Sequence, residues 1–222
     1  MTTTVASKKN LVFPIYEWQL QIPPVVGVDE AGRGCLAGPV CAAAVIFKET
    51  ADPSLFTDSK LLSAKRRDEL FDIIYQHAYV GVGFASVMEI EKINILKASL
   101  LAMKRAVESL VMDGRKVTPG IILVDGKFKI PGVSEPQVAL IKGELRASPI
   151  AAASIVAKVS RDRLMDKMHE QFPQYSFLQH KGYATEIHRA AIEKFGPTQH
   201  HRQSFAGVKE HLQRFPAVVP AS

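Results

Sequence analysis

The chain lacks the sequence features that mark disulfide-rich, zinc-binding, membrane-spanning and secreted proteins. Its only cysteines, Cys35 and Cys41, form no CxxC pair and no zinc-type cluster, so we expect a reduced, cytoplasmic protein without a disulfide framework. No apolar run reaches the roughly 20 residues needed to cross a bilayer. Residues 1–10 lack the apolar core of a secretion signal. These absences predict no membrane association.

Glycine-rich nucleotide-binding motifs are also missing. Gly32, Gly34 and Gly38 have the spacing G-x-G-x-x-x-G and lead into an expected strand, which does not fit the dinucleotide fingerprint. No G-K-[ST] triplet is present, so a P-loop is excluded. Six of the seven histidines lie within residues 169–211, without an H-x-x-x-H pair on a clear helix. We interpret them as a polar surface or phosphate contacts rather than a zinc site.

The charge is unevenly distributed along the 222 residues. Residues 142–215 contain twelve Lys and Arg against seven Asp and Glu, whereas residues 1–141 contain sixteen against fifteen. Such a basic end fits either a solvated face or a surface for a polyanion such as nucleic acid. Charge alone does not decide between the two.

Apolar periodicity predicts an α/β fold. The expected strands are short apolar runs at 25–28, 40–47, 79–87, 121–124 and 138–141. Four helices are expected. The first follows a cap at Ser63, and the second spans 93–110 and is ended by Asp113-Gly114. The third is capped by Ser148, with Pro149 at its first position, and ends before Pro173; the fourth starts near Thr185 and stops at Gly196-Pro197. An early meander followed by helical crossovers predicts a mixed sheet covered on both faces. Residues 1–24 are expected to be a flexible lead-in.

Carboxylates close two of the expected strands. Asp29 and Glu30 end the first apolar run, and Asp125 ends the run at 121–124. If these strands are parallel neighbours, the carboxylates meet at one sheet edge, where they could bind a hard cation such as Mg²⁺ or Mn²⁺. Because successive strand residues point to opposite faces, Asp29 and Glu30 can share one site only if the strand ends at Asp29.

A glycine-flanked arginine follows the first carboxylate pair. Glycines at 32 and 34 let backbone N–H groups approach an anion, and Arg33 is a natural phosphate contact. Each feature alone has an ordinary structural explanation, since Asp125-Gly126 is a common turn and Asp29-Glu30 would suit a solvated loop. Together they indicate phosphodiester chemistry.

Seven segments, in order along the chain, resemble the ribonuclease HII family, bacterial enzymes that cut the RNA part of RNA/DNA hybrids. They are residues 27–34, 38–40, 58–60, 123–126, 151–162, 180–185 and 201–205. One such segment is a weak signal, but seven in order are specific. The resemblance implies a single ribonuclease H-like catalytic domain over residues 25–222. It would have a mixed five-stranded sheet flanked by helices and a helical C-terminal extension, about residues 173–222, that binds substrate.

The resemblance also implies catalytic residues and a cofactor. Asp29, Glu30 and Asp125 would hold two divalent ions, Mn²⁺ or Mg²⁺, once substrate is bound, one activating the attacking water and one stabilising the leaving oxygen. The family's fourth carboxylate lies in a Lys-Gly-Asp motif, which here reads Lys142-Gly143-Glu144. Glu144 is therefore expected to coordinate, directly or through water.

The same resemblance implies how substrate is bound. Gly32, Arg33 and Gly34 would face the ribose with backbone N–H groups and read the 2′-OH, which distinguishes RNA from DNA. Tyr183 would stack on the sugar of the adjoining deoxynucleotide. Lys60 and the basic C-terminal third would contact phosphates. The expected partners are RNA/DNA hybrids and duplex DNA containing ribonucleotides, cut by a monomeric endonuclease.

Two alternatives accompany this prediction. The first is a catalytically inactive hybrid-binding module on the same fold, against which the intact Asp29, Glu30 and Asp125 argue, although Glu144 leaves it open. The second is the related ribonuclease HIII group, which usually carries an extra N-terminal domain and lacks the Gly-Arg-Gly turn. Only 24 residues precede the first expected strand, so we set this alternative aside.

Overall fold

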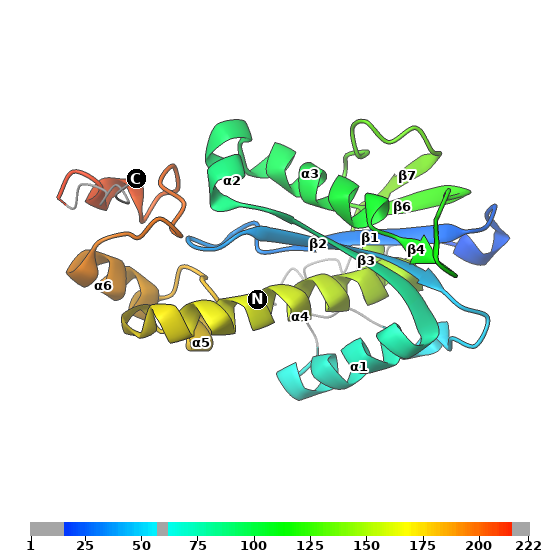
Figure 1. Cartoon of the computed structure of the whole chain (residues 1–222), viewed down its shortest axis with the longest axis horizontal. Helices are drawn as coiled ribbons and strands as arrows, with labels where there is room; N and C mark the ends of the chain where they lie inside the picture. The colour runs from blue at the N-terminus through cyan, green and yellow to red at the C-terminus, as the bar shows by residue number, and fades with distance from the viewer. Residues whose placement is uncertain (1–15, 57–61, 215–222) are drawn as a thin grey trace, which may run out of the picture.

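A five-stranded mixed sheet forms the centre of the computed structural model, which describes residues 16–56 and 62–214. The strand order is β3-β2-β1-β6-β7 (Figure 1). The strands are β1 (Val25–Ala31), β2 (Val40–Phe47), β3 (Ala78–Ala85), β6 (Ile121–Asp125) and β7 (Gln137–Leu140). The first three pair antiparallel, while β1 with β6 and β6 with β7 pair parallel. This confirms the predicted mixed sheet and the meander of its first three strands.

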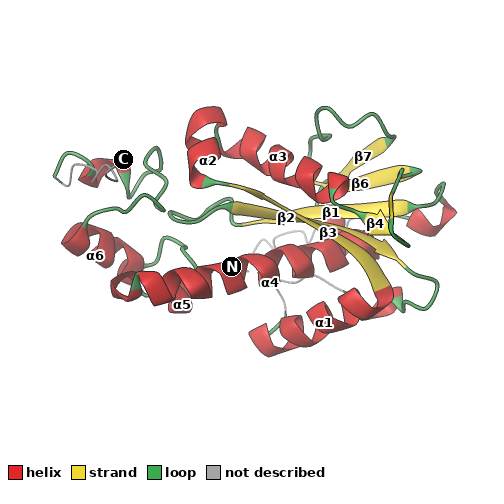
Figure 2. Cartoon of the chain, in the orientation of Figure 1, coloured by secondary structure: helices red, strands yellow, loops and turns green. Residues whose placement is uncertain are grey.

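Helices cover both faces of the sheet (Figure 2). On one face, α3 (Ile95–Glu108) packs an alanine-rich side with Met103 against the sheet. On the other face lie α1 (Ala64–His77) and the long α4 (Ser148–Gln171). The backbone of α4 comes so close to β1 that a Cβ on Gly27 would lie 2.1 Å from the carbonyl carbon of Pro149. A glycine is therefore needed there to seat the helix against the strand.

The C-terminal part extends beyond the sheet at the far end of α4 (Figure 1). It contains the short helix α5 (Phe177–His180) and α6 (Glu186–Phe195), joined by turns. A separate apolar cluster holds it to the loop before β2, through Phe177, Ile192 and Leu36 among others. The C-terminal part thus rests on an apolar core of its own rather than on the sheet.

The remaining elements are short. They are α2 (Val87–Ile93), the hairpin of β4 (Val111–Met112) and β5 (Arg115–Lys116), and 3-10 turns at Trp18–Leu20, Pro53–Leu55, Gly143–Leu145, Pro173–Tyr175 and Lys209–His211. The ring of Trp18 lies 5.8 Å from that of Phe47, so the segment before β1 packs on the sheet where it is described. Among the described residues, no helix is long and apolar enough to span a membrane.

Several predicted element boundaries are confirmed and others are wrong. The cap at Ser63 is confirmed, because its hydroxyl accepts a hydrogen bond from the Arg66 N–H; Thr185 caps α6 in the same way. The single helix predicted over 93–110 is wrong. Asn94 adopts a φ of 68° and separates α2 from α3, while its side chain caps α3. Asparagine tolerates a positive φ better than most residues. The spacing of apolar residues gives no sign of the break at Asn94.

Two further helix ends differ from prediction. The helix that was expected to end at Asp113-Gly114 stops at Glu108, and Asp113-Gly114 forms the turn between β4 and β5 instead. The N-cap of α4 is Ala147 rather than Ser148, which lies inside the helix with Pro149. Proline is well tolerated in the first helical turn, where its missing N–H has no partner to lose.

Candidate active site

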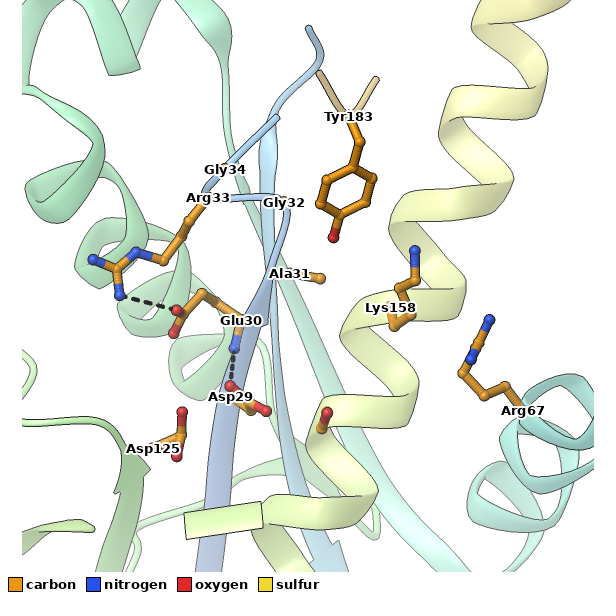
Figure 3. Close-up of a pocket in the computed structure, with 11 residues that line it drawn as sticks. Asp29, Glu30, Ala31, Gly32, Arg33, Gly34, Arg67, Asp125, Lys158 and Tyr183 are labelled. Carbon is orange, nitrogen blue, oxygen red and sulfur yellow. Dashed lines mark hydrogen bonds and ion pairs between the residues drawn. The ribbon is translucent and has the colours of Figure 1, made fainter. Parts of the chain in front are cut away.

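An open pocket lies where β6 ends beside β1 (Figure 3). Its lining comes from β1, the turn after it, the end of β6, α1, α4 and the loop after α5: Asp29, Glu30, Ala31, Gly32, Arg33, Gly34, Arg67, Asp125, Ser154, Lys158 and Tyr183. The structure therefore brings together most of the residues that the sequence singled out. The predicted phosphate contact Lys60 and the rest of segment 58–60 lie outside the described residues.

Asp29 and Glu30 share the pocket for a reason other than the one expected. The predicted break at Asp29 is wrong, because β1 continues to Ala31 and pairs with β2 that far. Pairing with β6 stops at Val28, opposite Val124. Among the described residues, no strand pairs with β1 on that side beyond this point, so both carboxylates reach the open edge of the sheet. It is the end of β6, and not of β1, that creates the site.

Asp125 is held at the end of β6 by the turn after β7. Its Oδ1 accepts a hydrogen bond of 2.7 Å from the backbone N–H of Gly143. A Cβ on Gly143 would lie 2.6 Å from Cδ1 of Ile150 and 3.2 Å from Oδ1 of Asp125, so a larger residue would crowd this contact. The next residue, Glu144, is buried behind Asp125 and is not among the residues lining the pocket.

The carboxylates raise each other's pKa values. Burial and the charge of Glu144 raise the pKa of Asp125 to about 7, against the hydrogen bond from Gly143. Burial and the charge of Asp125 raise the pKa of Asp29 well above its usual value. Negative groups crowded together out of water are destabilising unless a cation balances them. The donor set therefore fits a hard, oxygen-preferring divalent ion.

The carboxylates do not form a closed metal cage. Among the described residues, no three Asp, Glu, His or Cys side chains converge closely enough to hold one ion together. Mg²⁺ in nucleotide-processing sites commonly keeps several waters and takes only one or two carboxylates, the rest of its shell coming from substrate phosphates. An arrangement of spaced carboxylates around an open pocket is compatible with that mode of binding.

The two glycines of the turn after β1 differ in their surroundings. Gly32 is buried with a φ of +95°, and a Cβ on it would lie 2.0 Å from Nε of Arg161. Gly34 is exposed, has no positive φ, and a Cβ on it would meet no atom within 4 Å. The fold therefore requires a glycine at position 32. At position 34 the protein has room for a larger side chain, so the fold alone does not require glycine there.

Pocket residues on α4 and α1 escaped the sequence analysis. Ser154 and Lys158 are one turn apart on α4, and Arg67 lies on α1. The Nζ of Lys158 lies 5.3 Å from the ring centroid of Tyr183 and 2.8 Å from Oδ1 of Asp162. The i, i+4 spacing of Ser154 and Lys158 within segment 151–162 is the sequence signal that could have identified these two pocket residues. Polar groups one turn apart on an otherwise apolar helix face mark the side that meets solvent.

For three of the C-terminal histidines, the interpretation as a polar surface or phosphate contacts is wrong. His180, His188 and His201 are 7%, 0% and 0% exposed. The rings of His180 and His188 are stacked with centroids 4.4 Å apart. The ring nitrogens Nε2 of His188 and His201 lie 3.1 Å apart. These imidazoles form a buried cluster beneath the Tyr183 loop.

Backbone partners determine which nitrogen of each ring carries the proton. Nδ1 of His201 accepts from the N–H of Thr198, so its Nε2 must donate to His188. His188 then donates from Nδ1 to the carbonyl of Tyr183, at 2.9 Å. Nδ1 of His180 likewise accepts from the N–H of Gly182, so its Nε2 donates to Tyr175. All three rings are neutral and fix the backbone around Tyr183.

Acid should therefore loosen this part of the protein. Burial lowers the pKa of His188 to about 4 and that of His201 to about 3, whereas unfolded histidine takes up a proton near pH 6.5. Between these values the unfolded state binds more protons, so stability is full above about pH 6.5 and is lost as the pH falls toward 4. We expect His188→Gln to reduce the slope of unfolding free energy against pH by roughly 1 kcal/mol per unit in this window.

Urea unfolding of both proteins between pH 7 and 4.5 measures this slope. Comparing wild type with variant cancels the opposite contribution of Asp29 and Asp125, whose raised pKa values favour the folded state as the pH falls. His77→Gln, on α1 and outside the cluster, controls for the removal of a histidine elsewhere in the protein. Equal slopes for wild type and His188→Gln would contradict the neutral cluster.

Comparisons with known proteins agree with the geometry. The family described as Ribonuclease HII matches residues 26–208. A ribonuclease HII of Desulfotalea psychrophila is 54% identical over 189 residues, covering 85% of this chain and 83% of the relative. One of Cupriavidus metallidurans is 46% identical over 213 residues, covering 96% of this chain and 93% of the relative.

Solved structures share the fold. The ribonuclease HII of Archaeoglobus fulgidus, determined in a complex with PCNA, is 26% identical with a TM-score of 0.63; the match covers 82% of this chain and 95% of that one. The ribonuclease H2 of Pyrococcus horikoshii is 24% identical with a TM-score of 0.69, covering 86% and 98%. The sheet and its covering helices are therefore those of a known fold.

Proposed function

The chain belongs to the ribonuclease HII family of metal-dependent endonucleases, and from this premise we propose its reaction in detail. The protein hydrolyses the RNA strand of RNA/DNA hybrids and cuts on the 5′ side of single ribonucleotides embedded in duplex DNA. One observation carries the proposal: the open edge of β1 places Asp29, Glu30 and Asp125 around the same space as the turn at 32–34 (Figure 3). Groups suited to a divalent ion thus adjoin groups suited to a sugar-phosphate backbone.

Asp29, Glu30, Asp125 and Glu144 are the residues that we propose to hold divalent ions, Mg²⁺ or Mn²⁺. When bound, such ions activate water for attack on phosphorus and stabilise the charge of the leaving oxygen. The protein's own contribution is to hold the donors in place. The N–H of Gly143 orients Asp125, and the N–H of Glu30 orients Asp29 through a 2.7 Å hydrogen bond.

The rest of the pocket provides groups for binding and orienting the nucleic acid. The turn at 32–34 offers the backbone N–H groups of its exposed residues, Arg33 and Gly34, to the ribose, next to the carboxylates. Tyr183 is 41% exposed and presents its ring beside Lys158, which suits stacking on a sugar with a phosphate nearby. Arg67 closes the α1 side of the pocket with a further positive charge.

A cleavage assay tests this proposal. The protein is incubated with a DNA duplex containing one ribonucleotide, with Mg²⁺, with Mn²⁺, and with chelator. We expect cleavage 5′ to the ribonucleotide in the presence of metal, no cleavage with chelator, and no cleavage of the all-DNA duplex. Failure to cut with either metal would exclude the enzyme proposal, and retained binding in that case would favour an inactive hybrid-binding module.

A further inference from the structure

Two buried arginines lie behind the turn at 32–34. Arg161 on α4 and Arg202 near the C-terminus are 1% and 0% exposed. Both belong to the basic C-terminal third that the sequence assigned to phosphate contacts, and burial excludes that role for them. Among the described residues, neither guanidinium has an Asp or Glu oxygen within 4.0 Å. Their donors are directed at backbone carbonyls instead.

Arg202 binds the turn itself. Its Nη2 donates to the carbonyl of Gly32 and its Nη1 to that of Arg33, both at 2.7 Å. Its Nε donates to the carbonyl of Gly38 at 3.1 Å. Only the guanidinium fork can hold two consecutive carbonyls at once with fixed geometry, since a lysine offers one point of attachment.

The direction of these carbonyls determines the direction of the N–H groups. A peptide unit is planar and trans, so its C=O and N–H point in opposite directions. The carbonyl of Gly32 shares its peptide with the N–H of Arg33, and the carbonyl of Arg33 shares its peptide with the N–H of Gly34. Because Arg202 draws both carbonyls inward, both N–H groups point outward. In the described part of the chain, no carbonyl or side chain accepts a hydrogen bond from either.

The same C-terminal segment also supports Tyr183. His201 pairs with Ala37 in an isolated bridge. Its ring supports His188, which donates to the carbonyl of Tyr183. Arg161 links the two loops again, because it donates to the carbonyls of Ala37 and Lys181 at 2.9 and 2.8 Å. The turn at 32–34 and the Tyr183 loop are thus fixed to one another by consecutive residues, His201 and Arg202.

We propose that Arg202 is a positioning residue that aims the N–H groups of Arg33 and Gly34 at the ribose. It acts through two carbonyls and does not touch substrate. This inference rests on the proposed function, because it assumes that the turn at 32–34 contacts the ribose. A buried charge without a carboxylate partner is costly, which fits a group kept for geometry rather than for stability.

Binding measurements can separate positioning from a merely structural role. Two duplexes that differ only in one ribonucleotide are titrated in chelator, which prevents cleavage. We expect wild type to prefer the ribonucleotide duplex. Arg202→Lys should lose about tenfold of that preference while its affinity for the all-DNA duplex changes by less than about twofold. Arg163→Lys, exposed on the same helix as Arg161, is the matched control and should retain the preference.

The outcomes distinguish failure of the proposed ribose contact from failure of the inference about Arg202. If wild type shows no preference, the ribose contact of the proposed function is wrong, and Arg202 has nothing to position. If wild type prefers the ribonucleotide and Arg202→Lys does so equally, the inference about Arg202 is overturned.

A second variant decides the question if Arg202→Lys does not fold. Glu91, on α2, accepts hydrogen bonds from the backbone N–H and hydroxyl of Ser204, both at 3.1 Å. These bonds anchor the segment carrying Arg202 from the exposed side. Glu91→Ala should fold and lose about threefold of the preference, and an unchanged preference would overturn the inference.

Discussion

Replacing Asp125 by Asn should reduce cleavage by at least about a thousandfold while the protein remains folded and binds hybrid. The amide retains an oxygen that can accept the 2.7 Å hydrogen bond from the N–H of Gly143, so its position should not change. What disappears is a negative charge at the centre of the proposed metal site. The loss should therefore fall on the cleavage step, measured by single-turnover cleavage of a duplex with one ribonucleotide.

The melting temperature provides an independent test of the effect of Asp125→Asn. Burial and the neighbouring charge of Glu144 destabilise ionised Asp125 in the folded protein. Removing that charge should raise the melting temperature in chelator and weaken the further rise caused by Mg²⁺ or Mn²⁺. If Asp125→Asn cuts at the wild-type rate, the proposed site is misplaced.

Glu144→Ala serves as the comparison. Glu144 is buried behind Asp125 and does not line the pocket, so its removal should weaken cleavage less than Asp125→Asn does. Glu108→Ala, exposed on α3, controls for the loss of a carboxylate elsewhere. An equal loss in Glu144→Ala and Asp125→Asn would make Glu144 a full ligand.

Replacing Gly34 by Ala should reduce kcat/KM by about a hundredfold without unfolding the protein. The free protein has room for the added methyl, since no atom lies within 4 Å of it. Stability should therefore change by less than about 1 kcal/mol. A methyl in that space would keep the ribose from approaching the N–H of Gly34, so the loss is expected in substrate binding and cleavage alone.

Gly32→Ala provides the contrasting case. There the positive φ and the contact with Arg161 make the methyl incompatible with the fold, and we expect a destabilisation of at least about 2 kcal/mol. Urea unfolding and steady-state cleavage of both variants separate the two causes. Near-wild-type cleavage by Gly34→Ala would mean that substrate does not approach the turn closely.

The sequence by itself determined the strands of the five-stranded sheet, two of the helix caps and the acidic residues. Short apolar runs mark β2 and β6 because a strand buried on both faces has few polar positions. Ser63 and Thr185 mark helix starts because a hydroxyl binds the free N–H groups of the first turn. Asp29, Glu30 and Asp125 could be named because carboxylates at strand ends are local features of the chain.

Only the tertiary structure decided how those residues share a site. Asp29 and Glu30 face one pocket because β6 stops beside them, and no pattern within β1 carries that information. Arg202 binds the carbonyl of Gly32 across 170 residues of sequence, and Arg161 binds that of Ala37 across 124. In the sequence, nothing distinguishes Arg161 and Arg202 from the other basic residues. Their burial follows from contacts between distant segments, and local periodicity responds only to neighbours along the chain.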